Sequence, residues 1–149
     1  MKLILAALIL SLNLYAIEFS ITKRCENQPA LIENIEVLNS ITVSELTHYV
    51  FKTFEIPFIG DERSINSILG TPTGTDAYEV MTDNEIKVYG WCFQVNGVQP
   101  DRFMNQIILD PTEQLHVNWF YGYAHYLNGV WITYCTPAYE QKSPFVCSN

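Results

Sequence analysis

Four cysteines behind an export leader are the feature that most restricts how this chain can fold. Residues 1–16, MKLILAALILSLNLYA, have a basic start at Lys2, an almost wholly apolar run, and a small residue, Ala16, for cleavage. This is the layout of a secretory signal peptide, because the apolar run is shorter than the ~20 residues that a membrane-spanning helix needs. We therefore predict a secreted or periplasmic protein, without stable membrane insertion once the leader is cleaved after Ala16.

All four cysteines, Cys25, Cys92, Cys135 and Cys147, lie in the predicted mature chain. An even number of cysteines in a small exported protein is typical of disulfide pairs. A zinc site needs closely spaced ligands such as Cys-x-x-Cys, which the sequence lacks, so we expect no metal. Three pairings stay open. The one we favour joins Cys135 to Cys147, which would tether the tail, and Cys25 to Cys92.

The size and charge of the mature chain restrict its organisation and its partners. Residues 17–149 are enough for one domain with its own core. Seven basic against sixteen acidic residues leave that domain with a net charge near −9. Nucleic acid is excluded as a partner, because phosphate binding needs clustered lysines and arginines, and this sequence has no such cluster.

Periodicity and capping signals predict the elements of the N-terminal half. Ile17–Lys23 alternates apolar and polar residues as a half-buried strand does, and residues 30–38 form a second extended segment. Thr42 and Glu45 form a capping box in front of an apolar stripe, which predicts a helix over Val43–Phe54. One helix therefore follows two strands.

The middle of the chain contains its most unusual segment, GWCFQVNGV. Residues 60–83 before it read as polar and mostly irregular. Glu85–Val95 reads as a strand that places Trp91 and Phe93 on one face and Cys92 on the other. Apolar neighbours do not favour a reactive thiolate, so we expect Cys92 to be a structural half-cystine.

Asn128-Gly129, between two aromatic and β-branched runs, is the strongest hairpin signal in the chain. A two-residue loop sets five cross-strand pairs: Leu127 with Val130, Tyr126 with Trp131, His125 with Ile132, Tyr123 with Tyr134, and Gly122 with Cys135. Strands, one helix and a further run of strands predict an α+β domain, with a mixed sheet packed on the helix.

Aromatic residues are dense around this hairpin. A single helix shelters only one face of a sheet, so some rings between Trp119 and Tyr139 must be exposed or covered by the tail. Exposed amphipathic rings are typical of binding surfaces. We therefore predict a binding surface whose members flank the turn: Tyr123, Tyr126, Trp131 and Tyr134.

Four segments in order resemble the family of transcobalamin-like C-terminal domains: ITVSEL, INSILG, GWCFQVNGV and LHVNWFY. The resemblance covers residues 17–123, and most bacterial members of that family have no known function. It implies a β-grasp sheet on one main helix, here extended by a C-terminal hairpin strand and a cysteine-bearing tail. One departure is Pro111-Thr112-Glu113, which stands where the family usually has a Gly-Asp turn.

The resemblance also bears on cofactors. In vitamin-carrier relatives, this domain closes over a corrinoid that a separate helical domain holds. This sequence includes no such helical domain, so we expect no cofactor, and cobalamin stays only a candidate ligand implied by the family.

Catalytic motifs are missing from the sequence. His48, His116 and His125 are the only candidate bases, and no serine lies in a Gly-x-Ser-x-Gly elbow. We therefore expect a non-catalytic domain that binds a protein, a glycan or a flat small molecule. The alternatives are a small exported enzyme that uses His116 or His125 as its base, and a cell-surface assembly module that pairs through an exposed edge strand.

Overall fold

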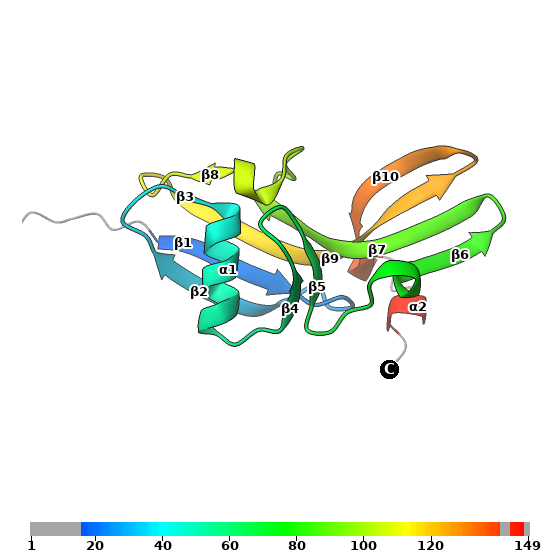
Figure 1. Cartoon of the computed structure of the whole chain (residues 1–149), viewed down its shortest axis with the longest axis horizontal. Coiled ribbons are helices and arrows are strands. Elements are labelled where there is room, and N and C mark those ends of the chain that lie inside the picture. Colours follow the sequence, from blue (N-terminus) through cyan, green and yellow to red (C-terminus); the bar gives the residue numbers. More distant parts are fainter. Residues whose placement is uncertain (1–15, 141–143, 148–149) are drawn as a thin grey trace, which may run out of the picture.

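The computed structural model describes residues 16–140 and 144–147 (Figure 1). It is an α+β structure, made mostly of strands in a curled mixed sheet with two helices, as the sequence predicts at this level. The predicted leader, residues 1–16, lies outside the described residues except for Ala16, which begins the first strand. No helix within the described part is long and apolar enough to cross a membrane.

The elements follow one another along the chain as strands interrupted by one full-length helix. The strands are β1 (Ala16–Thr22), β2 (Pro29–Glu36), β3 (Ile41–Thr42), β4 (Phe58–Gly60), β5 (Ile65–Ile68), β6 (Tyr78–Thr82), β7 (Glu85–Val95), β8 (Ile108–Leu109), β9 (Leu115–Leu127) and β10 (Val130–Pro137). The helices are α1 (Val43–Thr53) and α2 (Pro144–Cys147), with 3-10 turns at Gly74–Ala77, Met104–Gln106 and Ala138–Glu140.

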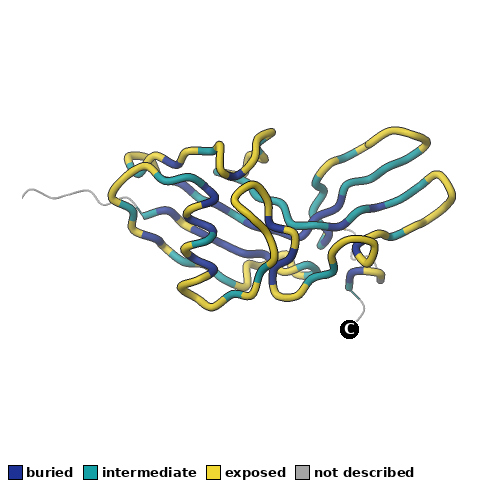
Figure 2. Tube along the Cα trace, viewed as in Figure 1, coloured by how far each residue is buried: buried dark blue, intermediate teal, exposed yellow. Residues whose placement is uncertain are grey.

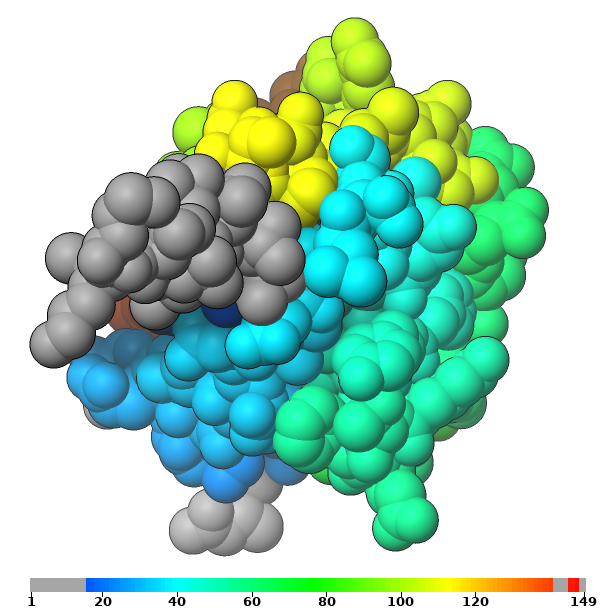
Figure 3. Space-filling view, turned by 90° about the vertical axis from the view of Figure 1, so that its left-hand side faces the viewer, coloured from blue at the N-terminus to red at the C-terminus, as the bar shows by residue number. Residues whose placement is uncertain are grey.

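The capping box at the start of α1 is confirmed. The Thr42 hydroxyl accepts a hydrogen bond from the Glu45 N–H at 3.1 Å, and the Glu45 carboxylate accepts one from the Thr42 N–H at 2.8 Å. These two bonds satisfy backbone donors that the first turn of a helix leaves unpaired. The two residues before the helix, which form β3, pair with β8 and so fix the position of its N-terminal end. Figure 3 shows β3, in cyan, against the yellow segment that includes β8.

One strand, β9, organises the main sheet. The strand order is β2-β1-β9-β7-β6, with β1 parallel to β9 and the other pairs antiparallel. Along one edge β9 pairs with β7 over residues 117–127. Its other edge is shared: residues 115–120 pair with β1, and residues 122–127 pair with β10. The sheet thus has a proximal half, which contains β2 and β1, and a distal half, which contains β10 and β6.

Helix α1 covers one face of the proximal half, here called the front face (Figure 1). The buried side chains that join α1 to the sheet include Leu46, Val50, Phe51, Phe19 and Trp119. The Trp119 indole N–H donates to the Thr47 hydroxyl at 3.1 Å, which satisfies the polar atom of a buried ring. Trp91 and Phe93 pack against this core, so their predicted inward orientation is confirmed.

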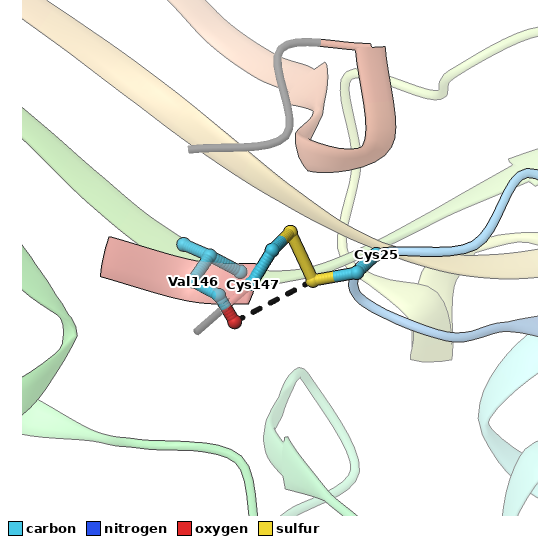
Figure 4. Close-up of a disulfide and its surroundings, with 3 residues drawn as sticks. All are labelled: Cys25, Val146 and Cys147. Carbon is cyan, nitrogen blue, oxygen red and sulfur yellow. Dashed lines mark hydrogen bonds between the residues drawn. A yellow bond between two sulfur atoms is a disulfide. The ribbon is translucent and has the colours of Figure 1, made fainter. Parts of the chain in front are cut away.

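The C-terminal tail covers the front face of the distal half. A second buried cluster joins Tyr89, Tyr121 and Tyr123 of the sheet to Ala138 and Val146 of the tail. The tail is fixed by a disulfide between Cys25, after β1, and Cys147, in α2, whose Cα atoms lie 5.6 Å apart (Figure 4). The Cys25 sulfur also contacts the Val146 carbonyl oxygen at 3.5 Å, and a half-cystine has no proton to donate there.

The favoured cysteine pairing was therefore wrong, although all four cysteines are paired. Cys25 joins Cys147, and Cys92 joins Cys135. The physical reason is the sidedness of the sheet. Cys25 and Cys147 both border the front-face cluster, whereas Cys92 follows Trp91 in β7 and points to the opposite face. A bond from Cys25 to Cys92 would have to pass through the sheet.

The predicted hairpin is confirmed at its turn and wrong further along. Asn128 and Gly129 both have positive φ, 50° and 89°, as the tight turn requires. The pairs Leu127–Val130 and Tyr126–Trp131 form as expected. Two register shifts in β10 then change the remaining three pairs: His125 faces Thr133, Tyr123 faces Thr136, and Gly122 faces Pro137. Such bulges increase the local twist of a strand.

This twist brings β10 over the back face, opposite to α1. Strands two apart in a flat sheet lie roughly 9–10 Å from each other, because neighbours are ≈ 4.8 Å apart. The Cα atoms of Cys92 in β7 and Cys135 in β10 are only 6.5 Å apart, although β9 lies between the two strands. Gly122 leaves the space that this crossing needs, since a Cβ there would lie 2.9 Å from the Thr136 carbonyl oxygen and 3.1 Å from the Cys135 sulfur.

The crossing of β10 over the sheet predicts that Gly122 does not tolerate substitution by alanine, whereas Gly90, which faces it in the sheet, does. We expect Gly122→Ala to lower the free energy of unfolding by about 1–3 kcal/mol, as overpacking does. Gly90→Ala should change it by less than about 1 kcal/mol, because a Cβ there meets no atom within 4 Å. Urea denaturation of the oxidised variants measures both values, and equal losses would contradict the close approach at Gly122.

Candidate functional site

The back face of the sheet changes character between its two halves. Side chains of β7 and β9 alternate, so Val88, Gly90 and Cys92 share the back face with Gly122 and Ala124. Toward β1 this face is mostly polar, apart from Ile32 and the buried Phe120, and toward β6 and β10 it is apolar and aromatic. The disulfide between Cys92 and Cys135 lies at the border.

The polar half contains the histidine that was considered as a base. Ser20 donates to the Asn118 side-chain oxygen at 2.9 Å, and its oxygen lies 2.7 Å from His116 Nε2. Because the single hydroxyl proton goes to Asn118, we assign the proton of the second contact to His116 Nε2. The Glu18 carboxylate lies 3.5 Å from the same nitrogen.

This polar cluster does not have the geometry of a catalytic triad. In a triad, the hydroxyl and the carboxylate occupy different nitrogens of the imidazole, whereas here both are on Nε2. The hydroxyl of Ser20 belongs to a residue that is only 1 % exposed. The arrangement is that of hydrogen-bonded polar residues on a sheet.

The aromatic half forms a trough. One depression of about 240 Å³ is lined by Tyr78, Ile86, Val88, Tyr126 and Trp131. A second one, of about 200 Å³, continues it past Val88, and its lining includes Ala124 and Tyr134. We call these seven residues the aromatic trough. Among the described residues that line either depression, none is charged.

Three rings of the hairpin form one side of the aromatic trough. Tyr126 and Trp131 meet nearly edge to face, with ring centroids 5.3 Å apart, and Tyr134 lies 6.4 Å beyond Trp131. Trp131 is 45 % exposed and Tyr134 74 % exposed. Figure 2 shows β10, the second strand of this hairpin, as exposed or intermediate along its whole length. Exposed rings that gather in one concavity are unusual for a surface without a partner.

The structure brings together three of the four residues that the sequence predicts. Tyr123 is the exception, because it lies three positions from Tyr126 and so points to the front face. It is 5 % exposed, packs on Tyr89, and has the Lys87 ammonium 5.0 Å from its ring centre. Tyr123 is therefore part of the core, and only its edge borders the second depression.

The opposite side of the aromatic trough was missed by the sequence analysis. Tyr78 belongs to β6, which lies inside the segment read as irregular. Its apolar alternation with Val80, followed by that of Ile86 and Val88 in β7, is the signal that could have revealed a second hairpin. That alternation is short, and two turn residues separate its parts.

The other histidines are held in local interactions. His125 Nε2 lies 2.9 Å from the Glu85 carboxylate, and both side chains are mostly buried. His48 Nδ1 lies 2.8 Å from the Ser44 carbonyl oxygen of the preceding helical turn. Among the described residues that line the two depressions of the back face, none is a histidine. Within the described residues, no three His, Cys, Asp or Glu side chains gather so that they could hold a metal ion.

Comparison of the chain with known proteins gives no relative. No family model, no curated protein and no solved structure matches it. What the aromatic trough does must therefore be argued from its own geometry.

The two faces predict different reactivities of the tyrosines toward tetranitromethane, which attacks accessible phenolates. Burial raises the pKa of Tyr121, against a smaller lowering by the Arg24 guanidinium, and burial also raises the pKa of Tyr123. Both phenols thus stay neutral and covered. We expect mass spectrometry to find Tyr134 nitrated and these two unmodified, with all three modified after unfolding. Nitration of Tyr123 in the folded protein would place it on the surface instead.

Proposed function

We propose that this protein is an exported, non-catalytic binding domain that stacks a flat, largely apolar ligand in the aromatic trough. The observation that carries the proposal is the gathering of Tyr78, Tyr126, Trp131 and Tyr134 around an uncharged concavity. Toward β1 the same face carries mostly polar side chains and, among the described residues there, no exposed aromatic ring, so the rings of the trough are not what this sheet presents to water everywhere. Export is supported by the leader-like start of the sequence and by the two disulfides.

The chemistry of the lining favours a flat apolar ligand over a glycan. Stacking on aromatic faces suits both, but the many hydroxyls of a sugar also need hydrogen-bond partners, and desolvating them without partners is costly. The side chains of the trough offer few such partners, chiefly the phenols of Tyr78, Tyr126 and Tyr134. Its two depressions together reach the lower end of the ≈ 300–1,000 Å³ typical of small-molecule sites.

The strand order gives some support to the β-grasp resemblance. A helix follows the first two strands of the main sheet, and the first strand lies parallel to the late strand β9 near the middle of that sheet. We propose on this basis that the domain is β-grasp-like. A corrinoid is one flat ligand that the resemblance suggests, and the proposal does not depend on it.

Removing two trough rings together, Tyr126→Ala with Trp131→Ala, tests the function. With the neutral fluorescent probe N-phenyl-1-naphthylamine, we expect at least about tenfold weaker binding, because each ring contributes on the order of 1 kcal/mol of contact. The circular dichroism spectrum should stay unchanged. Ile132→Ala is the control, since Ile132 is the exposed apolar neighbour of Trp131 in β10 and lies outside both depressions.

Two outcomes would contradict the proposal. Unchanged probe binding in the double variant would mean that the trough is not the binding surface. An unfolded double variant with a folded Ile132→Ala control would mean that Tyr126 and Trp131 serve as core.

A further inference from the structure

We propose that the front face carries a second binding site, which takes a small apolar molecule bearing a carboxylate. The site is a depression of about 320 Å³ between the loop that follows β1 and the turn that follows β5. Lys23 and Arg24 come from the loop, Leu69 and Thr71 from the turn, and Trp91 from β7. We call this depression the cationic pocket. Of its lining residues, only Trp91 also borders one of the two back-face depressions.

The apolar wall of the cationic pocket is held in position before any ligand arrives. The Trp91 indole N–H donates to the Thr71 hydroxyl oxygen at 2.7 Å. The same oxygen accepts from the Ile68 N–H at 3.3 Å, so the turn and the ring are fastened together. Because the polar atom of the indole is satisfied, what Trp91 offers to the pocket is a rigid apolar surface, which loses little entropy on binding.

Leu69 adds a second apolar surface in a conformation that costs energy. It has φ of 55°, the left-handed region that bulky residues rarely adopt, and its side chain is 52 % exposed. Its N–H donates to the Pro57 carbonyl oxygen at 2.9 Å, which holds this conformation. Gly70, the next residue, also has positive φ and tolerates it without strain. An apolar side chain kept in the open at a conformational cost is expected where it makes contact with something.

The two cations give the pocket its preference for an anion. Lys23 and Arg24 are two of only seven basic residues in 17–149, a segment with sixteen acidic ones. They are adjacent at one depression. The Lys23 ammonium lies 3.6 Å from the Glu26 carboxylate, but both side chains are about half exposed, and such surface pairs are weak. A ligand carboxylate can therefore replace Glu26 as the partner of Lys23 and also meet Arg24.

The volume limits the size of the apolar part. About 320 Å³ lies at the lower end of small-molecule sites, which suits a body of one or two fused rings. The proposed ligand class is thus a flat aromatic carboxylate, seated with its rings against Trp91 and Leu69 and its charge toward Lys23 and Arg24.

A pair of matched probes tests the site in the oxidised protein: 2-naphthoate and its neutral analogue 2-naphthamide, followed by isothermal titration calorimetry at low salt. We expect naphthoate to bind about tenfold more tightly than the amide, since two exposed ion pairs together amount to a factor of this order. In the variant Lys23→Gln with Arg24→Gln, the two probes should bind equally. In Glu26→Gln, naphthoate should bind severalfold more tightly, because its competitor for Lys23 is gone.

The proposal is overturned if neither probe binds, if both probes bind the unaltered protein equally, or if the double glutamine variant keeps the preference for naphthoate. The preference should persist in Tyr126→Ala with Trp131→Ala. Its loss there would place the probe in the aromatic trough, which overturns the cationic pocket and leaves the proposed function standing. Conversely, the variant Tyr126→Ala with Trp131→Ala can lose N-phenyl-1-naphthylamine binding and keep the preference for naphthoate. That result supports the aromatic trough and the cationic pocket as separate sites.

Discussion

A single edge of β9 serves two partners, and the remaining structure follows from this sharing. β1 pairs with residues 115–120 and β10 with residues 122–127, so β10 has to leave the plane where β1 ends. Gly122 stands at the change of partner and leaves room for the backbone of Thr136 and the sulfur of Cys135. The disulfide from Cys135 to Cys92 then holds β10 in its curled position over the back face.

This curl explains why one short chain has both a sheltered and an open set of aromatic rings. On the front face, α1 covers the proximal half, and the tail covers the distal half through the disulfide between Cys25 and Cys147. In the described part of the chain, no helix or tail lies over the back face of the distal half, and β10 forms only one side of it (Figures 1 and 2). The tyrosines of the front face therefore act as core, whereas those of the aromatic trough meet solvent.

Local signals in the sequence were enough to predict the helix, the hairpin turn and the oxidation of the cysteines. The Thr42–Glu45 box and Asn128-Gly129 each act over four residues or fewer, so no distant contact is needed to interpret them. The pairing of the cysteines and the register beyond Trp131 depend on two bulges and on which strand takes the edge of β9. These features depend on contacts between distant parts of the chain. For this reason the sequence analysis placed the buried Tyr123 in the binding surface and missed the contribution of Tyr78.

The most direct test of the curled sheet is the disulfide map of the native protein. Non-reducing digestion at acidic pH followed by mass spectrometry should give one linked peptide pair containing Cys25 and Cys147, and another containing Cys92 and Cys135. A linked pair that joins Cys25 to Cys92 would contradict the account, because those two sulfurs lie on opposite faces of the sheet and neither face could then be arranged as described.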